Sequence, residues 1–126
     1  MADNYTQATV IPDIPKSALT DKEWGILSAS GFTLFEFGDK TVYLVVKEGF
    51  ILDDDYDLDL GDVTALELFH KIIKNTDIEE IVIEGAYTCS KMRSGEFGGF
   101  VTRITKDGVE SFGTSQALDR MRAGTL

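Results

Sequence analysis

The stretch that decides the fold is residues 32–46, FTLFEFGDKTVYLVV, which has the pattern of two β-strands joined by a short turn. The two halves, 32–37 and 41–46, are rich in aromatic and β-branched residues, and Gly38-Asp39-Lys40 separates them. Such runs on either side of turn residues are typical of a β-hairpin. The second half is apolar on both faces, so we expect a central strand that is covered on both sides.

A helix is predicted just before this hairpin. Thr20 and Glu23 have the spacing of a capping box, in which each side chain bonds the backbone N–H of the other residue. Leu19 and Trp24 flank them in the positions of a hydrophobic staple. The helix should run to about residue 30, because Gly31 can take the left-handed conformation that ends many helices.

A second helix is predicted after the hairpin. Thr64 and Glu67 form another capping box, with Val63 and Leu68 as its staple pair. Lys71 follows Glu67 by four residues, so we expect an ion pair along this helix. Its apolar stripe has helical spacing and consists of Ala65, Leu66, Leu68, Phe69, Ile72 and Ile73.

The last third of the chain predicts three more strands and a short helix. One strand is expected at 79–83. A hairpin is expected at 100–106 and 109–112, because the Asp107-Gly108 pair between them suits the positive φ of a tight turn. Thr114 or Ser115 would then cap a short final helix that holds Leu118 and Met121 and ends at Gly124.

These elements follow in the order α-β-β-α-β-β-β-α, which predicts an α+β fold. Tight hairpins favour antiparallel pairing, so we expect a mainly antiparallel sheet of about five strands with two main helices and a short C-terminal helix. Residues 19–126 should form one domain, preceded by an extended segment at 1–18. Prolines disfavour helix in that segment, although Val10, Ile11 and Ile14 could pack as an edge strand.

The charge of the chain is negative and uneven. The net charge is −10; residues 1–90 hold 18 acidic and 6 basic side chains, whereas residues 91–126 hold 4 acidic and 6 basic ones. This balance argues against direct binding of nucleic acid or of an anionic membrane, because phosphate needs a basic surface. The single cysteine, Cys89, allows no internal disulfide, and no leader or spanning segment is visible, so we expect a cytoplasmic protein.

An aspartate run is the first candidate site. Its spacing does not fit a calcium loop, because counting from Asp53, Asp55 or Asp57 never places a glycine sixth and a glutamate twelfth. A looser Ca²⁺ or Mg²⁺ site is an alternative. We predict that the run binds a basic protein, since like charges at this density stay in water unless a cation meets them. The six carboxylates lie within ten residues, at Asp53, Asp54, Asp55, Asp57, Asp59 and Asp62.

The run could act in two ways. Asp55, Asp57 and Asp59 alternate with apolar residues, so an extended segment would have one acidic face. Carboxylates spaced along it would imitate the phosphates of a nucleic acid, and the partner would then be a nucleic-acid-binding protein. The alternative is a solvated loop whose last acids favour the N-terminus of the following helix.

The second candidate site is the segment 84–99, which is long for a connection between predicted strands. Cys89 lies near Lys91 and Arg93, which would favour its thiolate or bind an anion. A cysteine nucleophile also needs a base, and nothing in the sequence brings the only histidine, His70, close to it. We therefore predict no catalytic residue, no metal-binding residue and no cofactor.

These observations together predict a small, non-enzymatic binding protein that acts stoichiometrically on a basic protein surface. In its sharpest form it is an inhibitor that mimics nucleic acid, of the kind that mobile genetic elements use against host defence. One alternative is a small enzyme or anion-binding domain centred on residues 84–99. Another is a structural or assembly subunit that self-associates, with its basic C-terminal segment paired with the acidic part of a second copy.

Overall fold

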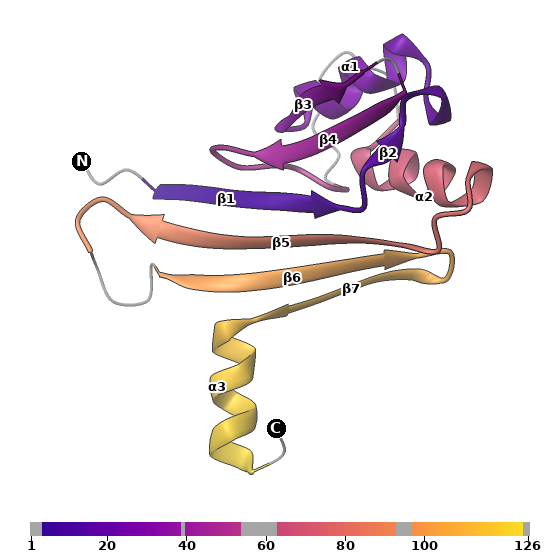
Figure 1. Cartoon of the computed structure of the whole chain (residues 1–126). Helices are drawn as coiled ribbons and strands as arrows, with labels where there is room; N and C mark the ends of the chain where they lie inside the picture. Colours follow the sequence, from indigo (N-terminus) through magenta and orange to yellow (C-terminus); the bar gives the residue numbers. More distant parts are fainter. Residues whose placement is uncertain (1–3, 39, 54–62, 93–96, 125–126) are drawn as a thin grey trace.

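The computed structural model describes residues 4–38, 40–53, 63–92 and 97–124, and within them the chain forms an α+β fold (Figure 1). All strand pairings among these residues are antiparallel, as predicted. The described part has seven strands rather than about five, and it begins with two strands that the predicted order lacks. The elements are β1 (Asn4–Ile11), β2 (Ile14–Pro15), a 3-10 turn (Lys16–Ala18), α1 (Asp21–Ala29), β3 (Phe32–Phe37), β4 (Thr41–Val46), α2 (Ala65–Asn75), β5 (Glu80–Cys89), β6 (Gly98–Thr105), β7 (Gly108–Gly113) and α3 (Thr114–Ala123).

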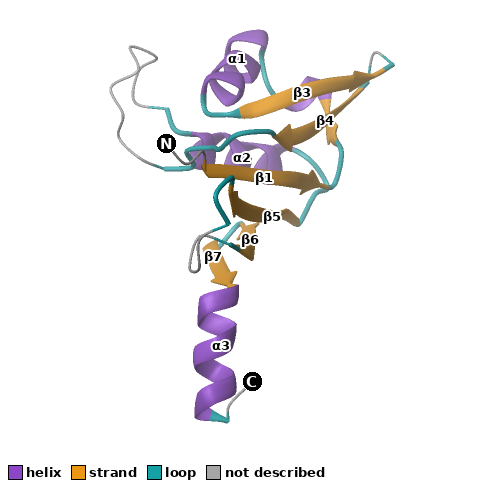
Figure 2. Ribbon diagram, turned by 90° about the vertical axis from the view of Figure 1, so that its left-hand side faces the viewer, coloured by secondary structure: helices purple, strands orange, loops and turns teal. Residues whose placement is uncertain are grey.

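The seven strands form one sheet in the order β2-β4-β1-β5-β6-β7, with β3 on β4. β3 pairs with the whole length of β4, from Phe32 opposite Val46 to Phe37 opposite Thr41. The other edge of β4 is shared, because β1 pairs with its C-terminal end and β2 with its N-terminal end. β3, β7 and the two-residue β2 therefore each have one neighbour in the described sheet, which Figure 2 shows in the view turned by 90°.

The N-terminal strand is central, which corrects the expectation of an edge strand. β1 lies between β4 and β5 and pairs with β5 along its whole length, from Asn4 opposite Cys89 to Ile11 opposite Val82. Ala8 and Val10 are buried, whereas Gln7 and Thr9, which alternate with them, are exposed. This alternation is that of a strand with one face on a core. The two prolines follow β1 and leave its ladder intact.

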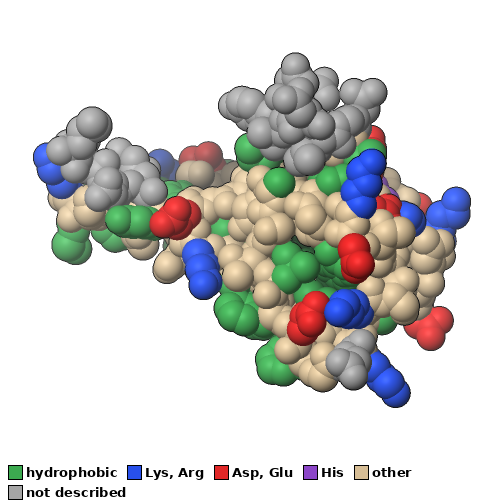
Figure 3. Space-filling model, turned by 90° about the horizontal axis from the view of Figure 1, so that it is seen from above, with side chains coloured by type: hydrophobic (Ala, Val, Ile, Leu, Met, Phe, Trp, Pro, Cys, Tyr) green, Lys and Arg blue, Asp and Glu red, His purple; other side chains and the backbone are tan. Residues whose placement is uncertain are grey.

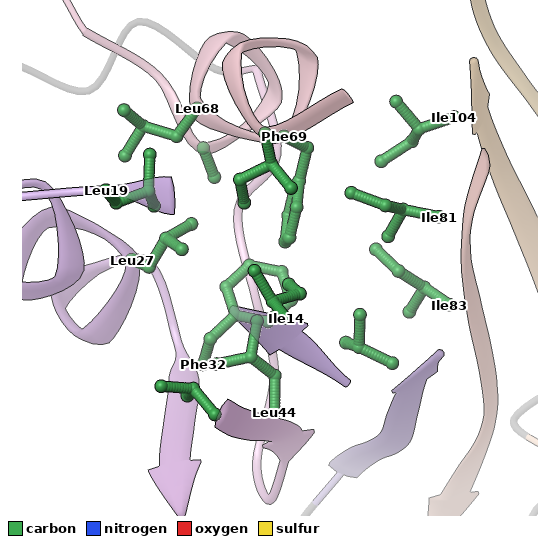
Figure 4. Close-up of a cluster of buried hydrophobic side chains, with 14 of the residues drawn as sticks. Ile14, Leu19, Leu27, Phe32, Leu44, Leu68, Phe69, Ile81, Ile83 and Ile104 are labelled. Carbon is green, nitrogen blue, oxygen red and sulfur yellow. The ribbon is translucent and has the colours of Figure 1, made fainter. Parts of the chain in front are cut away.

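The core lies between one face of the sheet and the helices α1 and α2 (Figure 4). α2 supplies the largest share, because its apolar stripe is buried apart from Leu66, which is half-buried. Phe69 and Phe32 meet edge to face with ring centroids 5.2 Å apart, an arrangement that aromatic rings favour. The sheet contributes alternate residues, among them Val42, Leu44 and Val46 of β4, Ile81 and Ile83 of β5 and Ile104 of β6.

β4 is central, as predicted, but only one of its faces is fully covered. Val42, Leu44 and Val46 are buried, whereas Thr41, Tyr43 and Val45 are half-buried. These half-buried side chains point to the side of the sheet away from the core, called the outer face below. The expectation that β4 is covered on both faces is therefore wrong for its outer face, where the side chains are only half-buried.

The predicted start of α1 is confirmed in detail. Thr20 Oγ1 accepts from the backbone N–H of Glu23, and Glu23 Oε1 accepts from the backbone N–H of Thr20 at 2.9 Å. Trp24 is buried, and its indole N–H donates to the carbonyl oxygen of Lys16 at 2.9 Å. The 3-10 turn is thereby tied to the helix that follows it.

The two helices are joined by an ion pair that the sequence did not indicate. Lys71 Nζ lies 2.6 Å from Glu23 Oε2 on α1, and the predicted pair with Glu67 is not the one formed. The bond from Lys71, together with the backbone N–H of Thr20, holds the pKa of Glu23 below its ordinary value. Glu67 instead donates its backbone N–H to Thr64 Oγ1, which confirms Thr64 as the N-cap of α2.

The C-terminal part differs from the prediction in three ways. β5 continues to Cys89 rather than ending near Ile83, and the last hairpin, turned at Gly108 with φ 147°, begins at Gly98. α3 is capped by Gly113 rather than by Thr114, which is its first helical residue. Gly124 ends α3 in the left-handed conformation, as expected. Among the helices of the described residues, none is long and apolar enough to cross a bilayer.

Candidate protein-binding surfaces

The structure describes only a small part of the acidic run. Asp53 is described, and it lies exposed in a bend after β4. The other five predicted partner-binding residues fall outside the described residues; they are Asp54, Asp55, Asp57, Asp59 and Asp62. The structure therefore shows the two ends of the run and the contacts that hold them.

The two ends of the acidic run are held at one place. The backbone N–H of Leu66 donates to the carbonyl oxygen of Leu52 at 2.8 Å. Both leucines are half-buried and pack against the hydrophobic core. The chain that carries the six carboxylates therefore leaves the core and returns to it at the same point.

The leading end has two further anchors. The ring of Phe50 lies 5.4 Å from that of Phe32 and 6.0 Å from that of Phe100. The backbone N–H of Ile51 donates to the carbonyl oxygen of Ser30 at 2.8 Å. Gly31 allows this approach, because a Cβ at that residue would overlap the backbone of Gly49 and lie 2.7 Å from Phe50 Cα.

The second predicted site is not an open loop. Residues 84–89 belong to β5, and Cys89 is only 3% exposed. Lys91 is exposed just after the strand, and Arg93 lies outside the described residues. A thiol buried in this way is closed to a substrate, so the geometry does not favour a cysteine-centred reaction.

Two glycines explain why this segment pairs as strand. Phe100 lies opposite Gly85, and a Cβ on Gly85 would come within 2.5 Å of the end of its ring. Tyr87 lies opposite Gly98, where an added Cβ would overlap the tyrosine ring. Each ring thus fills the space that the facing glycine leaves, which is a known way for a sheet to accommodate glycine.

The described residues contain no group of three or more His, Cys, Asp or Glu side chains that could hold a metal ion. His70 is half-buried on α2, and its Nε2 has no hydrogen-bond partner among these residues. All of the aspartate run except Asp53 lies outside these residues, and the absence of metal ligands stays a prediction.

One surface that sequence reasoning missed is an aromatic patch on the outer face of β3 and β4. The rings of Phe35 and Phe37 lie 6.5 and 6.2 Å from that of Tyr43, and both phenylalanines are exposed. Lys47 Nζ lies 5.4 Å from the centre of the Phe35 ring. The alternation of residues 33–37 could have indicated it, because it places both phenylalanines on the same face.

A cavity of about 660 Å³ opens beside this region, between α1, β3 and residues 47–49. It is lined by Trp24, Phe32, Leu34 and the charged pair Lys47 and Glu48, among others. Figure 3 shows hydrophobic side chains gathered in the middle of the face seen from above, with acidic and basic ones beside them. The lining of the cavity mixes apolar and charged groups and indicates no particular ligand.

The second missed surface is α3 together with β7. Figures 1 and 2 both show α3 extending away from the rest of the chain. None of its residues is buried, and Leu118 and Met121 are 44% and 61% exposed. The guanidinium of Arg120, in the last turn of α3, lies 4.8 Å from the centre of the Phe112 ring on β7. The sequence indicated this helix but could not indicate that the sheet leaves it uncovered.

Charges on the outer face of the C-terminal strands are partly paired. Arg103 on β6 bonds Glu80 on β5 at 2.7 Å and lies 3.5 Å from Glu110 on β7. The pair with Glu80 raises the pKa of Arg103 above its ordinary value, and Glu110 adds to the effect.

Comparison of the chain with protein-family models, with curated proteins and with solved structures finds no match.

Proposed function

We propose that this chain is a stoichiometric, non-enzymatic binding protein that presents its acidic segment, residues 53–62, to a basic surface on another protein. The observation that supports the proposal is the bond from Leu66 to Leu52, which holds both ends of the segment at one point of the core. Six carboxylates are therefore tethered close to one place on the molecule, rather than spread along a tail.

The physical consequence is a concentrated negative potential beside a rigid core. Such a potential attracts a basic partner, raises the association rate and disfavours partners of the same sign. A protein that normally binds DNA or RNA has the required lysines and arginines, because phosphate contacts depend on them. The sharpest form of the proposal is an antagonist that occupies such a surface in place of the nucleic acid.

The experiment is a binding measurement with two matched variants. The first carries Asp54→Asn, Asp55→Asn, Asp57→Asn and Asp59→Asn. The second removes four exposed acids elsewhere, with Glu48→Gln, Glu67→Gln, Glu84→Gln and Asp119→Asn. Both lose the same charge, so only the position differs.

The tagged wild type is used to capture partners from a nuclease-treated lysate of its native host at low and at high salt. We expect a basic partner that is retained by the wild type and by the second variant, lost with the first, and released by salt. Equal loss of the partner with both variants would mean that net charge, rather than the position of the acids, causes the binding. Equal retention with both would show that the acidic segment is not the binding surface.

A second candidate function is that of an assembly subunit that binds further copies of itself. The observation that favours it is the uncovered pair of α3 and β7. This function is compatible with the first, because the two surfaces are made of different residues.

A further inference from the structure

We propose that a second copy of this chain docks on β7 and α3, giving a two-fold dimer in which each α3 packs across the outer face of its partner's sheet. Three features carry this inference: a helix without cover, a strand with an unpaired edge, and an acidic groove that matches the helix in charge and position.

The helix is the first feature. α3 has ten residues, and isolated helices shorter than about 12–15 residues are marginal in water. Most helices gain their stability by packing an apolar face, yet no residue of α3 is buried in the described chain. Leu118 and Met121 lie three residues apart, so they share one side of the helix. Within the described residues nothing covers that side, so a second copy could supply the cover.

The strand is the second feature. Among the described strands, β7 pairs only with β6, which leaves the backbone of its other edge available. Such an edge is a template for a further strand. A two-fold axis pairs a strand with its own copy in the antiparallel sense, so β7 can add to β7 of the second copy.

The groove is the third feature. A cavity of about 430 Å³ opens at the ends of β1 and β5, with Ile11, Ile78 and Val82 as its apolar lining. The charged residues that line it are all acidic: Asp77, Glu79 and Glu80, of which Glu80 is already paired with Arg103. α3 offers the complement, because it carries Arg120 and Arg122 with a single acid, Asp119. Arg122 follows Leu118 by four residues and so lies beside the apolar side, whereas Arg120 lies over Phe112 of its own chain.

The strand register places the groove where α3 of a second copy would reach. Gly108 of β7 lies opposite Thr105, and Thr105 lies opposite Glu80 at the start of β5. The groove is therefore at the Gly108 end of the sheet. Antiparallel pairing of two β7 strands brings the Gly113 end of one copy, where α3 begins, beside that end of the other.

The helix also has the required length and side. Ten helical residues span about 15 Å. Neighbouring strands lie about 4.8 Å apart, so this length crosses β7 and β6 of the second copy and reaches its β5. Arg120 lies over Phe112, which is opposite Val101 on the outer face of the sheet. The groove residue Val82 is opposite Arg103, two residues after Val101, and so lies on the same face.

Analytical ultracentrifugation tests the dimer, with circular dichroism to check folding. We expect the wild type to dimerise and Leu118→Glu with Met121→Glu to weaken the dimer by roughly 30-fold or more, as for residues at the centre of an interface. The matched control, Phe37→Glu with Met92→Glu, changes two exposed apolar residues elsewhere and should leave the dimer unchanged. A wild type that stays monomeric up to about 1 mM would overturn the proposal.

A charge exchange tests the groove. Arg120→Glu with Arg122→Glu, and separately Asp77→Lys with Glu79→Lys, should each weaken the homodimer by repulsion. Mixing the two variants should restore a heterodimer, since each helix then meets a groove of opposite charge. Failure of the mixture to associate would overturn the groove as the docking site. Loss of the dimer in the variant with Asp→Asn at 54, 55, 57 and 59 would also overturn the groove as the docking site. That result would mean that the basic helix binds the acidic segment instead.

Discussion

Leu66 and Leu52 are joined by a backbone hydrogen bond of 2.8 Å, and this single contact brings together the two ends of the acidic segment. Both residues pack on the core, so both ends of the segment are anchored to it.

The first prediction concerns the close approach at Gly31. Gly31→Ala should destabilise the protein by about 1–3 kcal/mol, because φ is 105° there and the new Cβ would overlap the backbone of Gly49. Displacement of residues 49–51 would also loosen the leading anchor of the acidic segment. Urea denaturation measures the loss of stability.

Gly25→Ala is the matched control for Gly31→Ala. Gly25 lies within α1, and no atom lies within 4 Å of an added Cβ. Alanine should stabilise the helix there by roughly 0.5–1 kcal/mol, since it costs less conformational entropy than glycine. A destabilised Gly25→Ala variant, or a neutral Gly31→Ala variant, would contradict the described geometry.

The second prediction tests strand pairing in the segment that sequence patterns indicated as a loop. Gly98→Ala should cost about 1–3 kcal/mol, because the new Cβ would overlap the ring of Tyr87 and crowd Thr114. Gly99→Ala should change stability by less than about 0.5 kcal/mol, since its nearest atom would lie 3.5 Å away. Thermal unfolding of both variants compares the two sites, and equal effects would argue against the paired strands.

The third prediction concerns pH. The hydrogen bond from Lys71 lowers the pKa of Glu23 in the folded protein. The pair therefore stabilises the protein above the ordinary pKa of about 4.5, and this stabilisation is lost as pH falls through the lower folded value. Glu23→Gln keeps an N3 residue that suits the capping box but removes the charge.

The variant Glu23→Gln should therefore be less stable than the wild type at neutral pH, by no more than about 1 kcal/mol because the pair is partly exposed. The difference should shrink as the solution becomes more acidic than the ordinary pKa. Free energies of unfolding of both proteins across the acid range measure it. Parallel curves throughout would mean that the ion pair is not formed in solution.

The fourth prediction concerns the core contact between α2 and β3. Phe69→Ala should cost about 3–5 kcal/mol, because Phe69 is fully buried and its ring meets that of Phe32. Phe37→Ala, at a residue 59% exposed, should cost less than about 1 kcal/mol. Trp24 is the only tryptophan and is buried, so its fluorescence follows unfolding. Similar losses in both variants would be inconsistent with this core.

Local patterns predicted the elements whose causes are local. The capping box at Thr20, the N-cap at Thr64 and the turn at Gly108 each depend on residues within a few positions of one another. The apolar stripe of α2 is likewise readable from spacing alone. These features hold because the groups that interact are neighbours in the chain.

The candidate sites were predictable only in part. The charge of residues 53–62 is visible in the sequence, and so is the apolar side of α3. The groove lined by Ile11, Ile78 and Val82 was not, because Ile11 is 67 positions from Ile78 and 71 from Val82 in the sequence. Cys89 was read as a residue of a loop, since nothing local indicates that Tyr87 and Phe100 would each find a facing glycine.

The sequence by itself determined which segments become helix or hairpin, the uneven charge of the chain and the place of the acidic run. Only the tertiary structure decided that residues 4–11 form a central strand, that Lys71 pairs with Glu23, and that Leu52 meets Leu66. The physical reason is that backbone hydrogen bonds between distant segments carry no side-chain signature. Their partners are chosen by which faces can be buried together, and that choice is made by the whole chain at once.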